Sequence, residues 1–143
     1  ARTSELDLVM PVQAQLAFNE SGINPMQVDS LGFRERCLRR IEQGRTWVVV
    51  ENDELIFKAD VISKTAVVSY LEGVWVRDDF RHQHLGTRVM SELMRRLLED
   101  TKSICLLVNE TNERAQGFYR KCGFHFRATY ETIFLPRKEQ VQN

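Results

Sequence analysis

The chain has 143 residues, of which 43% are hydrophobic, and this suits one globular domain (1–143) with a core of ordinary size. Its 20 basic and 20 acidic side chains cancel, so overall charge draws it to neither nucleic acid nor an anionic membrane surface. No apolar run approaches the roughly 20 residues that span a bilayer, and no secretory signal is visible, so we expect a cytoplasmic protein.

The segment 7–20 is a predicted helix, since Pro11 lies close enough to its start to be tolerated. After a break at 21–25, Ser30 is predicted to cap a second helix that ends at Gly44. Its arginines make this helix basic. A solvated outer face explains these arginines, and electrostatic attraction of a charged substrate is the alternative. The helix would bury one apolar face, formed by Phe33, Cys37, Leu38 and Ile41.

Three strands are predicted next, at 46–50, 55–61 and 66–76, with a hairpin turn at 51–54 between the first two. A fourth, at 103–108, is almost wholly apolar, which is typical of a central strand buried on both faces. A helix at about 112–121 follows, and 124–135 is predicted to hold one or two closing strands. This order gives an α/β or α+β sheet with helices on both faces.

Between the third strand and the fourth lies the most informative stretch, in which the strand stops, a short basic loop follows and an amphipathic helix begins. Such a loop aims backbone N–H groups and the positive end of a helix at the space in front of it, so it predicts a phosphate or pyrophosphate site. Glu92 is placed to pair with Arg95 or Arg96. The apolar positions recur every three or four residues: Leu85, Val89, Met90, Leu93, Met94, Leu97 and Leu98.

The three cysteines, Cys37, Cys105 and Cys122, show no paired spacing and leave an odd thiol. Because Cys37 and Cys105 lie among apolar residues, we expect buried free thiols in a reducing cytosol. The chain begins at Ala1 and not at Met, which suggests processing, a trimmed tag or a fragment of a longer protein.

Two motifs, taken together and in this order, resemble the GNAT superfamily of N-acetyltransferases. The first aligns with the family's Arg/Gln-x-x-Gly-x-Gly/Ala loop and consists of Arg81, His82, Gln83, His84, Leu85 and Gly86. The second is the family's Asn-x-x-Ala-x-x-x-Tyr-x-x-x-Gly-Phe signature, which runs without a gap from Asn112 through Ala115 and Tyr119 to Phe124. The resemblance implies the acyl-CoA N-acyltransferase fold, whose mixed, mostly antiparallel sheet is flanked by helices on both faces.

The chain departs from the family pattern in two places. The family usually has a short first strand before its first helix, and 1–5 leaves little room for one. The segment also resembles the C-terminal acetyltransferase domain of two-domain bacterial proteins. The second departure is His84, which stands where glycine is usual and adds bulk beside the pyrophosphate site.

The resemblance implies acetyl-CoA as co-substrate. Its pantetheine arm would lie along the main chain of Val74, Trp75 and Val76, as an added strand does. The pyrophosphate would meet N–H groups from His82 to Thr87, with Arg81 as a charged contact. Thr87 is equally well explained as a helix cap. Asn112 is expected to hold the pantetheine amides, and it is equally well explained as the cap of its own helix.

The resemblance also implies direct attack of an amine on the thioester, with Tyr119 as the residue that protonates or hydrogen-bonds the CoA sulfur. The alternative for Tyr119 is an ordinary half-buried tyrosine on an amphipathic helix. As the base, Glu72 is the best candidate, because it is an acid inside an apolar strand where burial would raise its pKa. Alternation predicts that Glu72 shares a face with Tyr70, Val74 and Val76. The alternatives are a salt bridge or an exposed strand face for Glu72, and a chain of waters as the base. Tyr70, Asn109 and Glu110 are expected to line the acceptor pocket.

The expected partner is a small-molecule or peptide amine, with no nucleic acid and no membrane. Dimers are common in the family, which leaves a homodimer open. His82 and His84 suggest a metal pair, but no further Cys or His lies at a convincing spacing, so no metal is expected. A non-catalytic acyl-CoA-sensing or interaction domain is the alternative function, and a nucleic-acid-binding module is a remote one.

Overall fold

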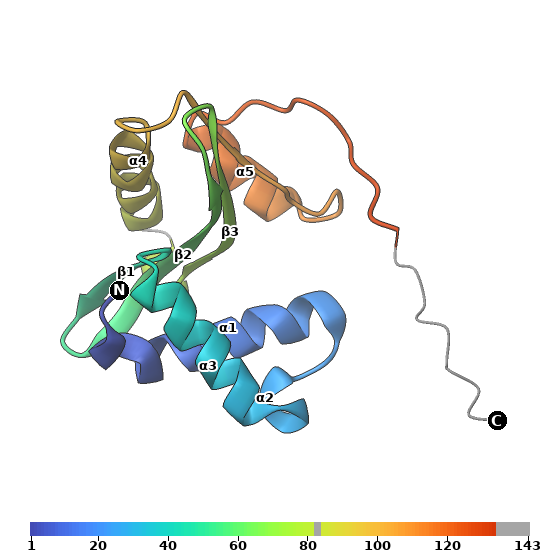
Figure 1. The fold of residues 1–143 in the computed structure, drawn as a ribbon. Helices are drawn as coiled ribbons and strands as arrows, with labels where there is room; N and C mark the ends of the chain where they lie inside the picture. Colours follow the sequence, from blue (N-terminus) through green and yellow to red (C-terminus); the bar gives the residue numbers. More distant parts are fainter. Residues whose placement is uncertain (82–83, 134–143) are drawn as a thin grey trace.

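Residues 1–81 and 84–133, which the computed structural model describes, contain four strands with helices on both faces of the sheet (Figure 1). The elements are η1 (Thr3–Glu5), α1 (Leu6–Ser21), α2 (Pro25–Val28), α3 (Ser30–Glu42), β1 (Thr46–Glu51), β2 (Glu54–Lys64), β3 (Val68–Val76), η2 (Asp78–Phe80), α4 (Leu85–Leu97), β4 (Ser103–Leu106) and α5 (Glu113–Lys121). Among them, α2, η1 and η2 are short segments that the sequence pattern did not predict.

The strands lie in the order β1-β2-β3-β4, antiparallel except for the parallel pair of β3 and β4. Asn52 and Asp53 turn the chain between β1 and β2, with φ angles of 51° and 60°. Positive φ at both central residues matches the right-handed twist of a hairpin, so the predicted turn is confirmed. The predicted fold class, a mixed and mostly antiparallel sheet between helices, is also confirmed.

Alternating residues of β1 face two different cores, with Trp47 and Val49 against one and Val48 against the other. Phe57, Ala59 and Val61 pack with α4 and with Cys122 at the end of α5. The second core lies between α1 and α3, where Val48 of β1 packs against it. Its buried members are Leu6, Val9, Met10, Ala14, Phe33, Cys37 and Ile41. Figure 1 shows α1, α2 and α3 together on one side of the strands.

The cap of α3 differs from the prediction by one residue. Asp29, and not Ser30, accepts a hydrogen bond from the N–H of Gly32 at 2.9 Å. Both side chains can cap a helix, and the longer Asp29 reaches the free N–H from one position further back.

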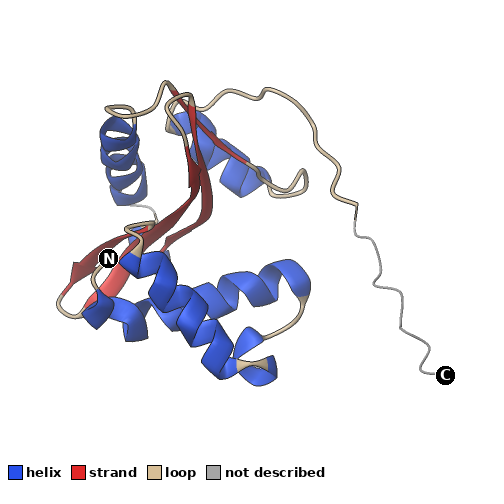
Figure 2. Cartoon of the chain, in the orientation of Figure 1, coloured by secondary structure: helices blue, strands red, loops and turns tan. Residues whose placement is uncertain are grey.

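The prediction that 103–108 is a central strand, buried on both faces, is wrong. β4 ends at Leu106 and lies at the edge of the sheet, with Ser103 and Cys105 exposed and Ile104 and Leu106 half-buried. The physical reason is that 124–133 forms no strand beside it, so the predicted closing strands are also wrong over these residues (Figure 2). Residues 134–135 of that prediction lie outside the described part of the chain.

The same edge position corrects the prediction for one cysteine. Cys37 and Cys122 are buried, whereas Cys105 is exposed, and all three thiols are free. Burial raises the pKa of the Cys37 and Cys122 thiols. Among the described residues, no helix is both long enough and apolar enough to cross a bilayer.

Candidate active site

The first component of the site is a stretch of β3 that lacks a neighbouring strand on one side. β3 pairs with β4 only from Val68 to Leu71, whereas its pairing with β2 continues to Val76. Over 72–76, therefore, one edge of β3 faces no other strand among the described residues. An unpaired edge of this kind accepts an extended ligand through main-chain hydrogen bonds. Val74, Trp75 and Val76, predicted to bind in this way, all lie on it.

A bulge at Gly73 sets which way the side chains of this stretch point. Asp60 pairs with Glu72 and Lys58 with Trp75, so Gly73 and Val74 together oppose Ala59. Gly73 has a φ of 57°, a left-handed conformation that glycine adopts without strain. A bulge of one residue reverses the alternation of side chains beyond it.

The reversal places Glu72 on a different face from the one that strict alternation predicts. Leu71, Val74 and Val76 all pack against the core beside α4. Glu72 instead lies opposite Asp60, whose side chain reaches Arg40 of α3. The prediction that Glu72 shares a face with Val74 and Val76 is therefore wrong, because it ignored the extra residue at Gly73.

Glu72 is exposed, so the burial considered for it is not observed and the alternative of an exposed strand face is. The hydroxyl of Tyr70 donates a hydrogen bond of 2.7 Å to a Glu72 carboxylate oxygen. Partial burial of Tyr70 raises its pKa, and the hydrogen bond to Glu72 raises it further. Tyr70 thus stays a neutral donor that orients the Glu72 carboxylate.

Beneath the bulge lies a buried ionic cluster that sequence reasoning missed. The Lys58 ammonium lies 2.6 Å from Asp60 Oδ2, and both side chains are 1% exposed. Arg40 and Thr46 also donate to the Asp60 carboxylate, at 2.9 and 2.8 Å. Burial lowers the pKa of Lys58, and the negative charge of Asp60 opposes that shift. The sequence signal that could have revealed this cluster is a pair of opposite charges spaced by two in the apolar middle of β2.

The cluster also contacts the bulge itself. The Lys58 ammonium donates a long hydrogen bond of 3.5 Å to the carbonyl of Gly73. A Cβ added at Gly73 would lie 3.1 Å from the Lys58 nitrogen and 3.3 Å from Asp60 Oδ2. Glycine is therefore required here both for its φ angle and for the close approach of the cluster.

The second component of the site is the start of α4. His84 is its N-cap residue, with a φ of 57°, and its side chain makes no capping hydrogen bond. Within the described residues the N–H groups of Leu85, Gly86 and Thr87 have no hydrogen-bond partner, and Arg88 donates the first bond of the helix, to the His84 carbonyl at 3.1 Å. Uncapped N–H groups at the positive end of a helix bind anions.

The alternative role of Thr87 as a helix cap is not observed, because His84 occupies the capping position. His82 and Gln83, also predicted to bind cofactor, lie outside the described residues. Arg81 turns back on the strand, where its Nε donates to the Val76 carbonyl at 2.8 Å and its guanidinium pairs with Asp78. These two contacts tie Arg81 to the end of β3 and to η2.

Gly86 lets α4 approach the other two elements of the site. A Cβ at this position would lie 3.2 Å from a methyl group of Val76 and 3.3 Å from the ring of Phe118. The start of α4 is consequently packed against both the end of β3 and the face of α5. A larger residue would push these elements apart.

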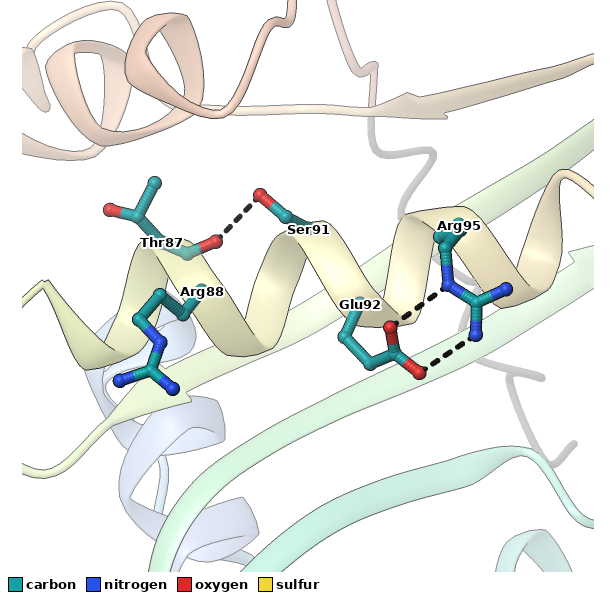
Figure 3. Close-up of a pocket in the computed structure, with 5 residues that line it drawn as sticks. All are labelled: Thr87, Arg88, Ser91, Glu92 and Arg95. Atoms are coloured by element: carbon teal, nitrogen blue, oxygen red, sulfur yellow. Dashed lines mark hydrogen bonds and ion pairs between the residues drawn. The ribbon is translucent and has the colours of Figure 1, made fainter.

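On its outer face, α4 carries a shallow hollow of about 390 Å³, shown in Figure 3 and lined by Thr87, Arg88, Ser91, Glu92 and Arg95. Ser91 donates to the Thr87 carbonyl at 2.8 Å, and Glu92 accepts from Arg95 and Arg96 as predicted. These two hydrogen-bonded arginines lower the pKa of Glu92 to about 2. Arg88 pairs with no carboxylate among the described residues, so its guanidinium is a cation near the start of the helix whose charge no acidic side chain there neutralises.

The third component is α5. Asn112 caps this helix by accepting from the N–H of Ala115 at 3.0 Å, so one of its two predicted roles is observed. Tyr119 is partly buried against the rings of Phe118 and Phe124, at centroid distances of 5.3 and 5.8 Å. Burial raises the pKa of Tyr119 to about 12. Within the described residues its hydroxyl has no hydrogen-bond partner, so it is a neutral phenol available to a ligand.

The structure brings several of the predicted residues together. Val74, Val76, Phe118 and Tyr119 all pack against the same core beside α4. Glu72 and Tyr70 lie across the bulge from them. Asn109 and Glu110 are exposed, and the Asn109 side chain accepts from the N–H and hydroxyl of Thr111 in a local turn. Among residues 1–81 and 84–133, no three His, Cys, Asp or Glu side chains gather as a metal site requires.

Solved structures share this fold at low sequence identity. A search of curated proteins found no match. A putative acetyltransferase from Agrobacterium tumefaciens is 17% identical with a TM-score of 0.70, and covers 94% of this chain and 96% of its own. A predicted acetyltransferase from Clostridium acetobutylicum, solved with acetyl-CoA, is 17% identical with a TM-score of 0.68, and covers 94% and 92%. An aminoglycoside acetyltransferase from an uncultured soil metagenomic sample, solved with sisomicin, is 12% identical with a TM-score of 0.68, and covers 95% and 93%.

The family model described as Acetyltransferase (GNAT) family matches residues 17–124, which include β3, the α4 loop and α5. This range spans both motifs on which the resemblance rested. The chain belongs to the GNAT family of acetyltransferases.

Proposed function

We propose that this chain is an acetyl-CoA-dependent N-acetyltransferase that moves the acetyl group to an amine by direct attack in a ternary complex. The observation that carries this proposal is the unpaired edge of β3 over 72–76, which ends beside the uncapped start of α4. One surface thus offers main-chain groups for an amide-containing arm and N–H donors for a pyrophosphate.

The residues present suit acetyl-CoA, which when bound supplies an activated acetyl group as a thioester. The main chain of Val74 and Val76 would hold the pantetheine arm. The N–H groups of Leu85, Gly86 and Thr87 would hold the pyrophosphate, and the absence of a Cβ at Gly86 keeps the helix start close to β3. Arg81, Trp75, Asn112 and Ala115 remain proposed contacts, as do His82 and Gln83.

In the transfer step the amine nitrogen forms a bond to the carbonyl carbon, and the bond from that carbon to sulfur breaks. Tyr119 gives its proton to the departing thiolate, and its pKa of about 12 means that it still holds that proton at neutral pH. The proton of the attacking amine passes to Glu72. Because the Glu72 carboxylate lies across the bulge from Val74, we place a water between the amine and this base.

A small-molecule or peptide amine is the proposed acceptor. The solved structures that share the fold include an aminoglycoside acetyltransferase with sisomicin and an AAC(6')-Iy complex with a bisubstrate analogue, so one fold accommodates small-molecule amines in those proteins. In this chain Tyr70 and Glu72 offer a hydroxyl and a carboxylate toward a cationic amine. The following stay predictions from the sequence: a cytoplasmic location, a bacterial origin, a single domain over 1–143 and a place at the C-terminus of a two-domain protein.

Two substitutions test this proposal against a non-catalytic acyl-CoA-sensing domain. Tyr119→Phe and Glu72→Gln should each lower kcat by about a hundredfold, because each removes one proton-transfer group. The Kd of each variant for acetyl-CoA should stay within about twofold of the parent value, since the proposed cofactor contacts come from main-chain groups and not from these two side chains. The matched control is Tyr130→Phe, at an exposed tyrosine outside both motifs, which should leave both constants unchanged.

The measurements are steady-state kinetics against a panel of amines and calorimetric titration with acetyl-CoA. Binding of acetyl-CoA without turnover on any amine would support the sensor. Full activity of Tyr119→Phe would remove that residue from the mechanism.

A further inference from the structure

A buried pair of opposite charges lies beneath the bulge of β3, at the point where the proposed cofactor surface begins. The side chains of Lys58 and Asp60 are each 1% exposed, and 2.6 Å separates the Lys58 nitrogen from Asp60 Oδ2. Taking two charges out of water costs free energy that their mutual attraction often does not return, so an apolar pair of similar volume would serve stability about as well. Stability alone therefore does not explain why this pair is buried.

The two members of the pair differ in what else they contact. Arg40 of α3 and Thr46 of β1 donate to the Asp60 carboxylate, so Asp60 would keep two partners if Lys58 were removed. The Lys58 ammonium reaches the backbone of the bulge, where it donates to the Gly73 carbonyl at 3.5 Å. Within the described part of the chain, Lys58 is the member of the cluster that bonds to the bulge. Its contact to the main chain is thus separable from the anchoring of Asp60.

Polar atoms from β2 and α1 surround the bulge at close range. A Cβ built on Gly73 would lie 3.1 Å from the Lys58 nitrogen, 3.3 Å from Asp60 Oδ2 and 3.7 Å from Gln13 Oε1 of α1. Two residues of β3 oppose one residue of β2 at the bulge, so the regular ladder is interrupted there. The ammonium therefore holds the backbone at a point where strand pairing holds it less firmly.

The contact to the Gly73 carbonyl also sets the direction of the next main-chain donor. In a planar trans peptide the N–H group points opposite to the C=O group. A Gly73 carbonyl held toward Lys58 therefore directs the Val74 N–H to the opposite side. Val74 is the first of the residues whose main chain is proposed to hold the pantetheine arm. In a buried setting, an ammonium holds a carbonyl more strongly than it does in water.

We propose that Lys58 is a positioning residue for acetyl-CoA, whose ammonium holds the Gly73 carbonyl and thereby sets the backbone of 73–76 for the pantetheine arm. Asp60 keeps the ammonium in place and balances its charge, while Arg40 and Thr46 anchor Asp60 to α3 and β1. This inference rests on the proposed function and deepens it, since a side chain buried beneath the sheet then controls cofactor affinity. No covalent step is involved.

Lys58→Met tests the proposal, because methionine keeps an unbranched side chain and removes the donor. Calorimetric titration should give a Kd for acetyl-CoA at least about tenfold above the parent value. The second probe is 3′-phosphoadenosine 5′-diphosphate, which is CoA without its pantetheine arm. Its Kd should stay within about twofold of the parent value, since it would meet the start of α4 and not β3. A residue that acts only on folding would not separate the two probes.

The matched control is Arg40→Gln, which takes a cation from Asp60 and leaves the contact of Lys58 to Gly73. Both variants should lower the urea midpoint, because each removes a partner of the buried carboxylate. Only Lys58→Met should lose acetyl-CoA affinity. A double variant, Lys58→Met with Asp60→Asn, removes both buried charges and keeps an amide oxygen for Arg40 and Thr46. It should separate the two probes in the same way, even where Lys58→Met alone folds poorly.

Unchanged acetyl-CoA affinity in folded Lys58→Met, or in the double variant, would overturn the proposal. So would an equal loss of affinity in Arg40→Gln, or an equal loss for both probes, since either result would assign the effect to general destabilisation and not to the bulge. A parent chain that binds no acetyl-CoA would instead overturn the proposed function itself, and with it any positioning by Lys58.

Discussion

His84 is a histidine in the left-handed conformation, with a φ of 57° at the N-cap of α4. Its Cβ crowds the neighbouring carbonyl, which costs the folded state about 1–2 kcal/mol, and glycine avoids this cost. Glycine in turn lowers folding stability by about 0.5–1 kcal/mol, because its unfolded chain has more conformational freedom to lose. His84 therefore lowers folding stability relative to glycine, and it adds an imidazole beside the proposed pyrophosphate site.

We expect His84→Gly to raise the free energy of unfolding by about 0.5–1 kcal/mol, the difference between these two effects. His84→Val, with a β-branched side chain, should lower it by more than about 1 kcal/mol. Urea denaturation of the three proteins measures both. A His84→Gly variant that is less stable than the parent would show that the imidazole contributes more than its strain removes.

The pH dependence of folding stability tests the environment of the Tyr119 side chain. Its pKa is about 12 in the folded chain and about 10 in an unfolded one, so between these values the unfolded state alone loses the proton. Ionisation thus favours unfolding, and folded stability should fall as pH rises from 10 to 12, by up to about 2–3 kcal/mol.

The check is to compare parent and Tyr119→Phe by urea denaturation at pH 9 and pH 11.5. The parent should lose more stability than the variant over this interval. Tyr70 titrates in both proteins, so its contribution cancels in the difference. Equal losses in the two proteins would mean that the Tyr119 hydroxyl lies in water.

Among the elements, the bulge in β3 decides how the site is arranged. Gly73→Ala should lower the free energy of unfolding by at least about 1–2 kcal/mol, because alanine is strained at a φ of 57° and its Cβ meets Lys58 and Asp60. Acetyl-CoA affinity should fall with it, since the bulge aims the main chain of 74–76.

Gly117→Ala is the matched control, as it lies inside α5 with no atom within 4 Å of the added Cβ. This change should stabilise the chain by about 0.5–1 kcal/mol through helix propensity. Thermal or urea unfolding measures both variants. Equal effects of the two substitutions would rule out a specific role for the bulge.

The elements that sequence predicted correctly are those whose pattern is local. The spacing of Met90, Leu93 and Leu97 predicted α4, and the pair Asn52 and Asp53 predicted a hairpin. The face of Glu72 could not be obtained in this way, because one extra residue at Gly73 reverses the alternation and only the pairing with β2 reveals it. Lys58 and Asp60 were missed because their pairing depends on Arg40 and Thr46, which come from α3 and β1.

At the scale of the whole molecule, the limit of sequence reasoning lies at the β4 edge. The apolar run Ile104, Leu106, Leu107 is typical of a buried central strand, and the segment 124–135 is typical of closing strands. A local pattern of side chains does not specify whether a partner strand forms beside it, and among the described residues none pairs with the outer edge of β4.

A thermal melt with excess acetyl-CoA tests the proposed acetyl-CoA site most directly, with CoA and ATP as comparators. At about a hundredfold over Kd, binding to the folded chain should add about 2.7 kcal/mol, which for this length raises Tm by about 5–10 °C. Acetyl-CoA and CoA should both give this shift, and ATP should not. No shift at millimolar acetyl-CoA, or an equal shift with ATP, would contradict the site formed by β3, α4 and α5.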